Sequence, residues 1–203
     1  MAKYGRSHHA QQMSLLVGTD GTISGTDFND TIFGTDLSES IWSGQGIDEI
    51  HGGGGDDYLE GGVGNDALFG DDGNDVLVGF AGADTLTGGT GADTFKLNEE
   101  AWLFQNDGWH WSPDRDGERD TITDFNSAEG DKIDLSGDAL LHYIDTDGDQ
   151  RSEVYPVTWA DVEILTLGAD QYRVVVHQVA GDPQWDLSID VLGAAPVEAD
   201  FVF

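Results

Sequence analysis

The chain has 203 residues and a formal net charge of −32, from 40 acidic and only 8 basic residues, and it contains no cysteine. This balance argues against nucleic acid and anionic membrane surfaces as partners, because phosphate binding depends on Lys and Arg. Disulfides are excluded, and no run approaches the length of about 18 apolar residues that a membrane-spanning helix needs. A chain this acidic is expected to stay disordered unless it binds a cation.

Residues 1–13, with His8 and His9, are interpreted as an added leader and take no part in the predicted fold. The apolar run that follows, Leu15 to Val17, is too short for the core of a signal peptide. Residues 14–24 are predicted to lead into the main domain. Ile23 lies nine residues before Ile32 and is expected to cap the start of the same apolar column.

Residues 25–96 consist of eight consecutive nine-residue blocks. They follow the pattern G-G-x-G-x-D-x-U-x, in which U is apolar. Block position 6 is a carboxylate in every block: Asp30, Glu39, Asp48, Asp57, Asp66, Asp75, Asp84 and Asp93. Block position 8 is apolar in every block: Ile32, Ile41, Ile50, Leu59, Leu68, Leu77, Leu86 and Phe95. Eight blocks in unbroken register argue against a flexible Gly-rich linker.

The period of nine predicts a six-residue turn followed by a three-residue strand, so that two blocks make one 18-residue coil. Stacked coils place the apolar residues in two facing columns. They also place the carboxylates one strand spacing apart, about 4.8 Å. Unit charges about 5 Å apart repel by roughly 3 kcal/mol at an effective dielectric near 20, so the carboxylate columns cannot close without a cation.

Calcium suits such a column, because it takes about 6–8 oxygen ligands that include carboxylates and backbone carbonyls. Carboxylates two blocks apart share a flank, which gives six internal pairs and about six or more ions. The carbonyls at block positions 2 and 4 are expected to join the position 6 carboxylates as ligands. These carbonyls belong to Gly44, Gly46, Gly53, Gly55, Gly62, Gly64, Asp71, Gly73, Phe80, Gly82, Gly89 and Gly91. Sites that use Glu39 are expected to be weak or empty.

The nonapeptide resembles that of the RTX (repeats-in-toxin) family of calcium-binding parallel β-rolls. The resemblance implies an all-β fold, a right-handed parallel β-roll over residues 14–96. It also implies a module that stays unfolded in a calcium-poor cytosol, leaves through a type I exporter and folds outside. The expected location is therefore secreted, extracellular or at the cell surface, with a passenger domain N-terminal to the roll.

Residues 97–203 are predicted to form a β-rich capping region. Its first part carries Trp102, Trp109 and Trp111. These side chains either cover the open end of the roll or contact a sugar polymer. The second alternative defines a rival function, a polysaccharide- or surface-binding accessory module of an exoenzyme or adhesin.

The segment 120–136 is similar to the segment that follows the repeats in serralysin-type metalloproteases, and to the repeat modules of alginate epimerases. The resemblance implies that Asp120 and Asp124 finish the last calcium site; two short strands with solvated acids are the alternative. Asp145 to Asp149 begins like an EF-hand loop, but Gln150 and Pro156 break that pattern. A lone calcium site and a simple acidic turn both remain open there.

Residues 162–179 predict a β-hairpin around the turn 168–171, and 186–191 alternate with the period of a half-buried strand. Together they are expected to form a small sandwich-like cap. The terminal residues 199–203, an acidic residue followed by hydrophobic ones, resemble the C-terminal secretion signal of type I exported proteins. No zinc motif H-E-x-x-H, nucleophile elbow or cysteine nucleophile occurs. We therefore expect no enzyme.

Overall fold

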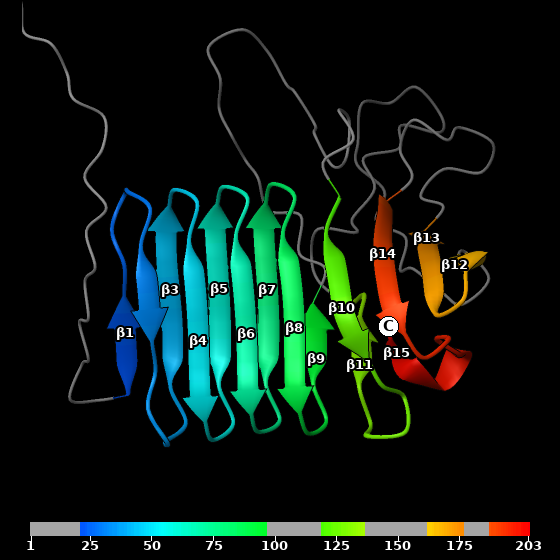
Figure 1. Cartoon of the computed structure of the whole chain (residues 1–203), viewed down its shortest axis with the longest axis horizontal. Helices are drawn as coiled ribbons and strands as arrows, with labels where there is room; N and C mark the ends of the chain where they lie inside the picture. The colour runs from blue at the N-terminus through cyan, green and yellow to red at the C-terminus, as the bar shows by residue number, and fades with distance from the viewer. Residues whose placement is uncertain (1–20, 97–118, 137–161, 177–186) are drawn as a thin grey trace, which may run out of the picture.

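The computed structural model of the chain describes residues 21–96, 119–136, 162–176 and 187–203. Within these ranges the chain is all-β and forms two sheets that run along the length of the molecule (Figure 1). Consecutive strands from β1 to β9 alternate between the two sheets, as expected for a solenoid in which each coil adds one strand to each side.

The seven-stranded sheet, called sheet A, has the order β1 (Thr22–Ser24), β3 (Ser40–Gln45), β5 (Tyr58–Val63), β7 (Val76–Ala81), β9 (Thr94–Lys96), β11 (Lys132–Asp134) and β15 (Phe201–Val202). The eight-stranded sheet, called sheet B, has the order β12 (Val162–Gly168), β13 (Gln171–Val176), β14 (Leu187–Gly193), β10 (Thr121–Phe125), β8 (Thr85–Thr90), β6 (Ala67–Asp72), β4 (Glu49–Gly54) and β2 (Thr31–Phe33).

The strands of the roll pair in parallel, with residues 18 apart as partners. Ile32 pairs with Ile50 in sheet B, and Ile41 pairs with Leu59 in sheet A. The predicted roll with two nine-residue blocks in each coil is therefore confirmed. This register follows from the sequence, because a slip of one residue would move every apolar side chain to the opposite face of its strand.

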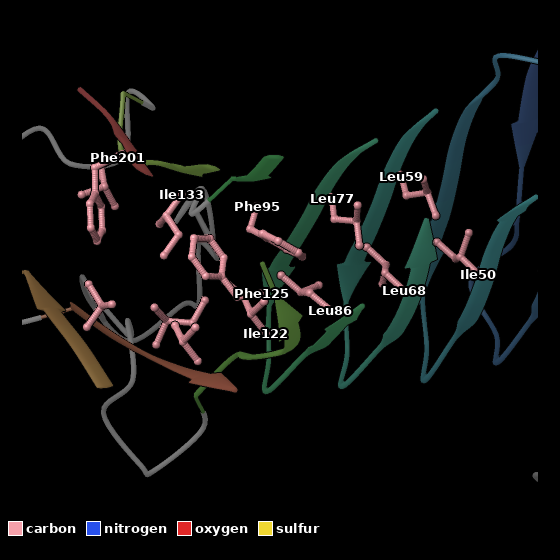
Figure 2. Packing of buried hydrophobic residues seen from close by; sticks show 14 of the residues in the cluster. Ile50, Leu59, Leu68, Leu77, Leu86, Phe95, Ile122, Phe125, Ile133 and Phe201 are labelled. Carbon is pink, nitrogen blue, oxygen red and sulfur yellow. The ribbon is translucent and has the colours of Figure 1, made fainter. Parts of the chain in front are cut away.

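The core lies between the two sheets and consists of the side chains at block position 8 (Figure 2). All eight are fully buried, and Ile23 extends the column at the N-terminal end as predicted. Ile122, Phe125 and Ile133 continue it beyond the last block. Each fully buried Leu or Ile contributes about 1.5–3 kcal/mol, so the column alone is a large stabilising contribution.

The strands are longer than the three residues expected from the repeat. β1, β2 and β9 have three residues, but β3 to β8 each have six. The reason is that block positions 2 and 3 also pair with the next coil: Gly44 lies opposite Gly62, and Gln45 opposite Val63. The turn between sheets is correspondingly tighter than a six-residue loop.

Block position 2 requires a left-handed backbone in these longer strands. Gly44, Gly53, Gly62 and Gly89 have φ between 96° and 106° there. Asp71 and Phe80 occupy the same position with φ of 71° and 73°. For residues with a Cβ this conformation costs roughly 1–2 kcal/mol. Pairing holds Asp71 from both sides, through Gly53 and Gly89, and holds Phe80 from one side, through Gly62.

The C-terminal part extends both sheets. β12 and β13 form the predicted antiparallel hairpin, and β13 also pairs antiparallel with β14. β14 in turn pairs parallel with β10, next to β8 of the roll. The expected sandwich-like cap is therefore a continuation of the roll, with antiparallel strands in sheet B facing β11 and β15 of sheet A.

The last described residues close the end of sheet A. Phe201 in β15 pairs with Ile133 of β11 and is 7% exposed. A short 3-10 helix, Glu198–Asp200, precedes it, and Lys132 Nζ donates to the Ala199 carbonyl at 2.8 Å. In the part of the chain that the structure describes, no helix is long and apolar enough to span a membrane.

Candidate metal centre

The position 6 carboxylates form two hydrogen-bonded columns, one along each edge of the roll. Flank one carries Asp30, Asp48, Asp66 and Asp84, and flank two carries Glu39, Asp57, Asp75 and Asp93. In each column the backbone N–H of one acidic residue donates to a carboxylate oxygen, Oδ1, of the acidic residue 18 positions later, at 2.7–2.9 Å. The predicted stacking of the carboxylates is therefore confirmed, and all six predicted pairs are adjacent.

The second carboxylate oxygen has no such partner. From Asp48 to Asp84, every stacked aspartate keeps its Oδ2 atom buried and without a hydrogen bond in the described structure; the residues are Asp48, Asp57, Asp66, Asp75 and Asp84. Their side chains are 1–2% exposed, so water does not replace the missing donor. A buried, uncompensated carboxylate is strongly unfavourable, and the arrangement therefore fits a bound cation.

Glycine at block position 1 makes room for this oxygen. A Cβ atom at Gly61 would lie 2.7 Å from Asp66 Oδ2, and one at Gly70 would lie 2.4 Å from Asp75 Oδ2. The exception is Ser43, which is fully buried and donates its hydroxyl to the Gly61 carbonyl. The sequence pattern thus keeps donors and side chains away from the free oxygen.

Block position 4 brings backbone carbonyls to the same flanks. A Cβ at Gly64 would lie 1.5 Å from the Gly46 carbonyl oxygen, and one at Gly73 would lie 1.8 Å from the Gly55 carbonyl oxygen. Only glycine permits this approach. The position 4 glycines also lie beside the carboxylate columns, since a Cβ at Gly64 would lie 3.2 Å from Asp66 Oδ1. The role of the carbonyls at positions 2 and 4 as ligands stays a prediction.

Side chains alone do not make a metal site here. Among the described residues, no group of three or more His, Cys, Asp or Glu side chains could hold an ion. Each neighbouring pair of coils supplies two stacked carboxylates, fewer oxygens than calcium takes. An ion at these flanks would need backbone carbonyls as well, which is what the glycine-rich turns expose.

Burial raises the pKa of the stacked carboxyls, because the charged form loses its hydration. The pKa rises to about 7 for Asp66 and Asp75, and to about 6 for Asp57 and Asp93. The backbone N–H donated to each carboxylate lowers the pKa in part, and the neighbouring carboxylates in the column raise it further. Without a cation, these carboxyls therefore stay protonated to a higher pH than ordinary aspartates do.

The pH dependence of the calcium-free chain follows from these shifts. Between the unfolded value of 3.8 and the folded values of about 6 to 7, the folded chain binds more protons than the unfolded chain. Its free energy of unfolding therefore falls as the pH rises through this window. We expect far-ultraviolet circular dichroism of calcium-free protein to show β-structure near pH 4–5 that is lost toward pH 7.5.

Calcium should reverse this trend, because it binds the ionised carboxylates and competes with protons. At fixed ionic strength, saturating calcium should therefore raise the thermal unfolding midpoint more at pH 7, where the calcium-free fold is weak, than at pH 5. A calcium-free chain that gains β-structure over the same pH interval would contradict the assignment of the buried carboxyls.

The columns continue past the last block. Asp120 Oδ1 accepts from Asp84 N at 2.9 Å and extends flank one. Asp124 accepts from Gly88 N and Gly89 N, at the start of the block that carries Asp93 of flank two, at 3.0 and 2.9 Å. Burial raises the pKa of Asp93 and Asp131, and the charge of Asp124 raises it further. The structure thus places both predicted terminal residues at the end of the roll, and their role as calcium ligands stays a prediction.

Sequence reasoning missed Asp131. Its Oδ1 accepts from Asp93 N at 3.1 Å and its Oδ2 from Asn126 N at 2.8 Å, and its side chain is 3% exposed. The spacing from Asp131 to Ile133 repeats the interval from position 6 to position 8, as does that from Asp120 to Ile122. The two-residue interval from the acidic to the apolar residue could therefore have identified Asp131. It was missed because Asp131 lies two residues after the position that the nine-residue period predicts.

Two predictions lie outside the described residues. They are the acidic turn from Asp145 to Asp149 and the tryptophan cluster of Trp102, Trp109 and Trp111.

Comparison with known proteins agrees with the repeat geometry. The family model described as RTX calcium-binding nonapeptide repeat (4 copies) matches residues 17–36, 33–68 and 60–95. A sequence search of curated proteins gave no match.

Two solved structures that are similar to the chain are subunits of the AlgE6 mannuronan C5-epimerase from Azotobacter vinelandii. The AlgE6R3 subunit is 24% identical, with a TM-score of 0.45 over 96% of this chain and 85% of the subunit. The AlgE6R2 subunit is 22% identical, with a TM-score of 0.48 over 92% of this chain and 94% of the subunit.

Proposed function

We propose that the chain is a calcium-dependent folding and secretion module of a larger extracellular protein, because residues 17–95 match the family model of RTX calcium-binding nonapeptide repeats. The observation that supports this function most directly is the set of buried, unpartnered Oδ2 atoms along both flanks. They make the folded roll unfavourable at neutral pH until cations bind, so calcium controls whether the module is folded.

The switch depends on the calcium concentrations on the two sides of a membrane. Extracellular calcium modules bind at roughly 10⁻⁴ to 10⁻³ M, far above what a calcium-poor cytosol supplies. The binding free energy then becomes folding free energy outside the cell. Inside, the charge of −32 opposes compaction and keeps the chain available for export.

The C-terminal residues fit this order of events. Residues 199–203 are the proposed type I secretion signal, and in the folded chain Phe201 pairs with β11 and is nearly buried. Asp200 is 2% exposed and accepts from Ser127 Oγ at 2.8 Å. An exporter could read this segment only while the chain is unfolded, so export would precede calcium binding.

The proposed partners are a type I exporter, contacted transiently, and a passenger N-terminal to the roll. Once folded, the roll would present its first coil toward that passenger and help to fold, anchor or position it. The rival polysaccharide-binding function depends on Trp102, Trp109 and Trp111, outside the described residues. It predicts a change of tryptophan fluorescence on titration with polysaccharide that is lost in Trp109→Ala.

Export can be tested with a passenger fused to residue 1 and produced together with a type I exporter. We expect the passenger in the medium for the intact chain, and loss of export when residues 199–203 are deleted. Phe95→Ala serves as the matched control, because it weakens the folded core without touching the tail and should leave export unchanged. Equal export with and without the tail would contradict the proposed signal.

A further inference from the structure

The first coil differs from the later coils at block position 2, where Thr26 and Thr35 replace glycine. The Thr26 backbone N–H and hydroxyl both donate to Asp30 Oδ2, at 2.7 and 2.8 Å. On flank two, the Thr35 backbone N–H donates to Glu39 Oε2 at 3.0 Å, and the Thr35 hydroxyl donates to Oε1. Both first-coil carboxylates are therefore held by donors from their own turn.

The oxygen occupied in this way corresponds to the free oxygen of the later coils. A Cβ at Gly25 would lie 2.9 Å from Asp30 Oδ2, and a Cβ at Gly52 would lie 2.6 Å from Asp57 Oδ2. The two oxygens thus occupy the same place relative to block position 1. In Asp57 this atom has no partner, whereas in Asp30 it accepts two hydrogen bonds from Thr26.

The backbone explains why threonine changes the coil. At block position 2 the later turns have positive φ, including the strained Asp71 and Phe80. Thr26 and Thr35 are not among the described residues that have positive φ. A β-branched residue strongly disfavours that region, so threonine keeps its N–H directed at the carboxylate of its own block.

We propose that Thr26 and Thr35 end the two calcium columns, so that ions begin at the Asp48–Asp66 pair on flank one and the Asp57–Asp75 pair on flank two. This inference rests on the proposed function. An ion between Asp30 and Asp48, or between Glu39 and Asp57, would have to displace the threonine donors from the carboxylate.

The remaining oxygen of Asp30 fits the same interpretation. Asp30 Oδ1 is buried and has no partner in the described structure. In every later rung of flank one, Oδ1 accepts the N–H of the preceding rung, as Asp48 Oδ1 does from Asp30 at 2.8 Å. Oδ1 is thus the atom that accepts a backbone N–H within each column. Oδ2 is the atom that Thr26 binds in Asp30 and that an ion would bind in the later coils.

Such a cap suits a terminal coil. An ion at the outermost rung would take ligands from one neighbouring coil only, whereas a threonine donor needs no second coil. The first coil then presents a surface toward the passenger that does not depend on calcium, while Asp48, Asp57 and the later carboxylates make folding calcium-dependent.

The test is the number of calcium ions bound per chain, measured by equilibrium dialysis of the full chain in saturating calcium at pH 7.5. We expect one additional ion in Thr26→Gly, one in Thr35→Gly and two in the double variant, because glycine removes the hydroxyl and permits positive φ. Thr26→Ser retains the hydroxyl and should bind the same number of ions as the unchanged chain.

Thr90→Gly is the matched control. Thr90, the last residue of β8, also donates its hydroxyl to an aspartate, Asp72, at 2.9 Å, but it stands at block position 3. Its ion count should not change. An unchanged or lower count in both Thr26→Gly and Thr35→Gly would overturn the inference, as would failure of these variants to fold in saturating calcium. If the unchanged chain bound no calcium, the proposed function itself would fail.

Discussion

Removal of calcium at pH 7.5 is expected to abolish the β-roll. The pKa of Asp66 and Asp75 in the folded chain is about 7, so at pH 7.5 these buried groups would be mostly charged. Neighbouring carboxylates about 5 Å apart then repel by roughly 3 kcal/mol per pair at an effective dielectric near 20. With several adjacent pairs on each flank, this repulsion exceeds the about 5–15 kcal/mol that stabilises an ordinary domain.

Calcium titration followed by circular dichroism measures this effect. Protein freed of calcium should show a disordered far-ultraviolet spectrum and no cooperative thermal transition, and added calcium should restore both in one steep, cooperative step. Each ion bound only by the folded state adds about 2.7 kcal/mol when free calcium is 100 times its dissociation constant. Coils that share carboxylates should therefore fold together.

Two controls separate ion binding from charge screening. Sodium chloride at matched ionic strength screens exposed charges but does not satisfy buried oxygens, so it should not restore the spectrum. Magnesium demands near-octahedral geometry and gives up its water reluctantly, so it should be far less effective than calcium. A compact, β-rich chain in excess chelator at pH 7.5 would overturn the central argument.

The regular part of the fold could be predicted because one period specifies two separate constraints. The residues at position 8 fix the register of the core, from Ile32 to Phe95, and the carboxylates at position 6 fix which side chains stack. Both constraints repeat every nine residues, so the same strand register and the same stacking are predicted independently from each block. The hairpin of β12 and β13 was predictable for a different reason, since its turn is short and local.

The parts that could not be predicted are those in which a local interaction competes with the repeat. Thr26 was a departure from the consensus in the sequence, and only the structure shows that its hydroxyl reaches Asp30. Phe80 breaks a glycine position, yet it pairs with Gly62 of the preceding coil and has positive φ. Asp131 lies out of step with the nine-residue period in the sequence. It joins its column because β11 pairs with β9, with Lys132 opposite Thr94.

Substitution of Asp66 by alanine is expected to raise the calcium midpoint for folding more than substitution of a carboxylate in the first coil. Asp66 belongs to two stacked pairs, because its Oδ1 accepts from Asp48 N and its own N–H donates to Asp84 Oδ1, both at 2.8 Å. Alanine leaves the buried Asp48 N–H without its acceptor, at a cost of about 1–3 kcal/mol. It also removes a proposed ligand from two ion sites, each worth about 2.7 kcal/mol at 100 times the dissociation constant.

Three matched variants separate these contributions in the same calcium titration. Asp66→Asn retains an acceptor for Asp48 N–H and loses only the charge, so its midpoint should lie between those of the unchanged chain and Asp66→Ala. Glu39→Gln acts where Thr35 already holds the carboxylate, and it should shift the midpoint little. Asp36→Ala removes an exposed charge from a first-coil turn and should have no measurable effect. Equal midpoints for Asp66→Ala and Glu39→Gln would show that the stacked carboxylates do not share ions, because a shared ligand at the centre of a column must matter more than a capped one at its end.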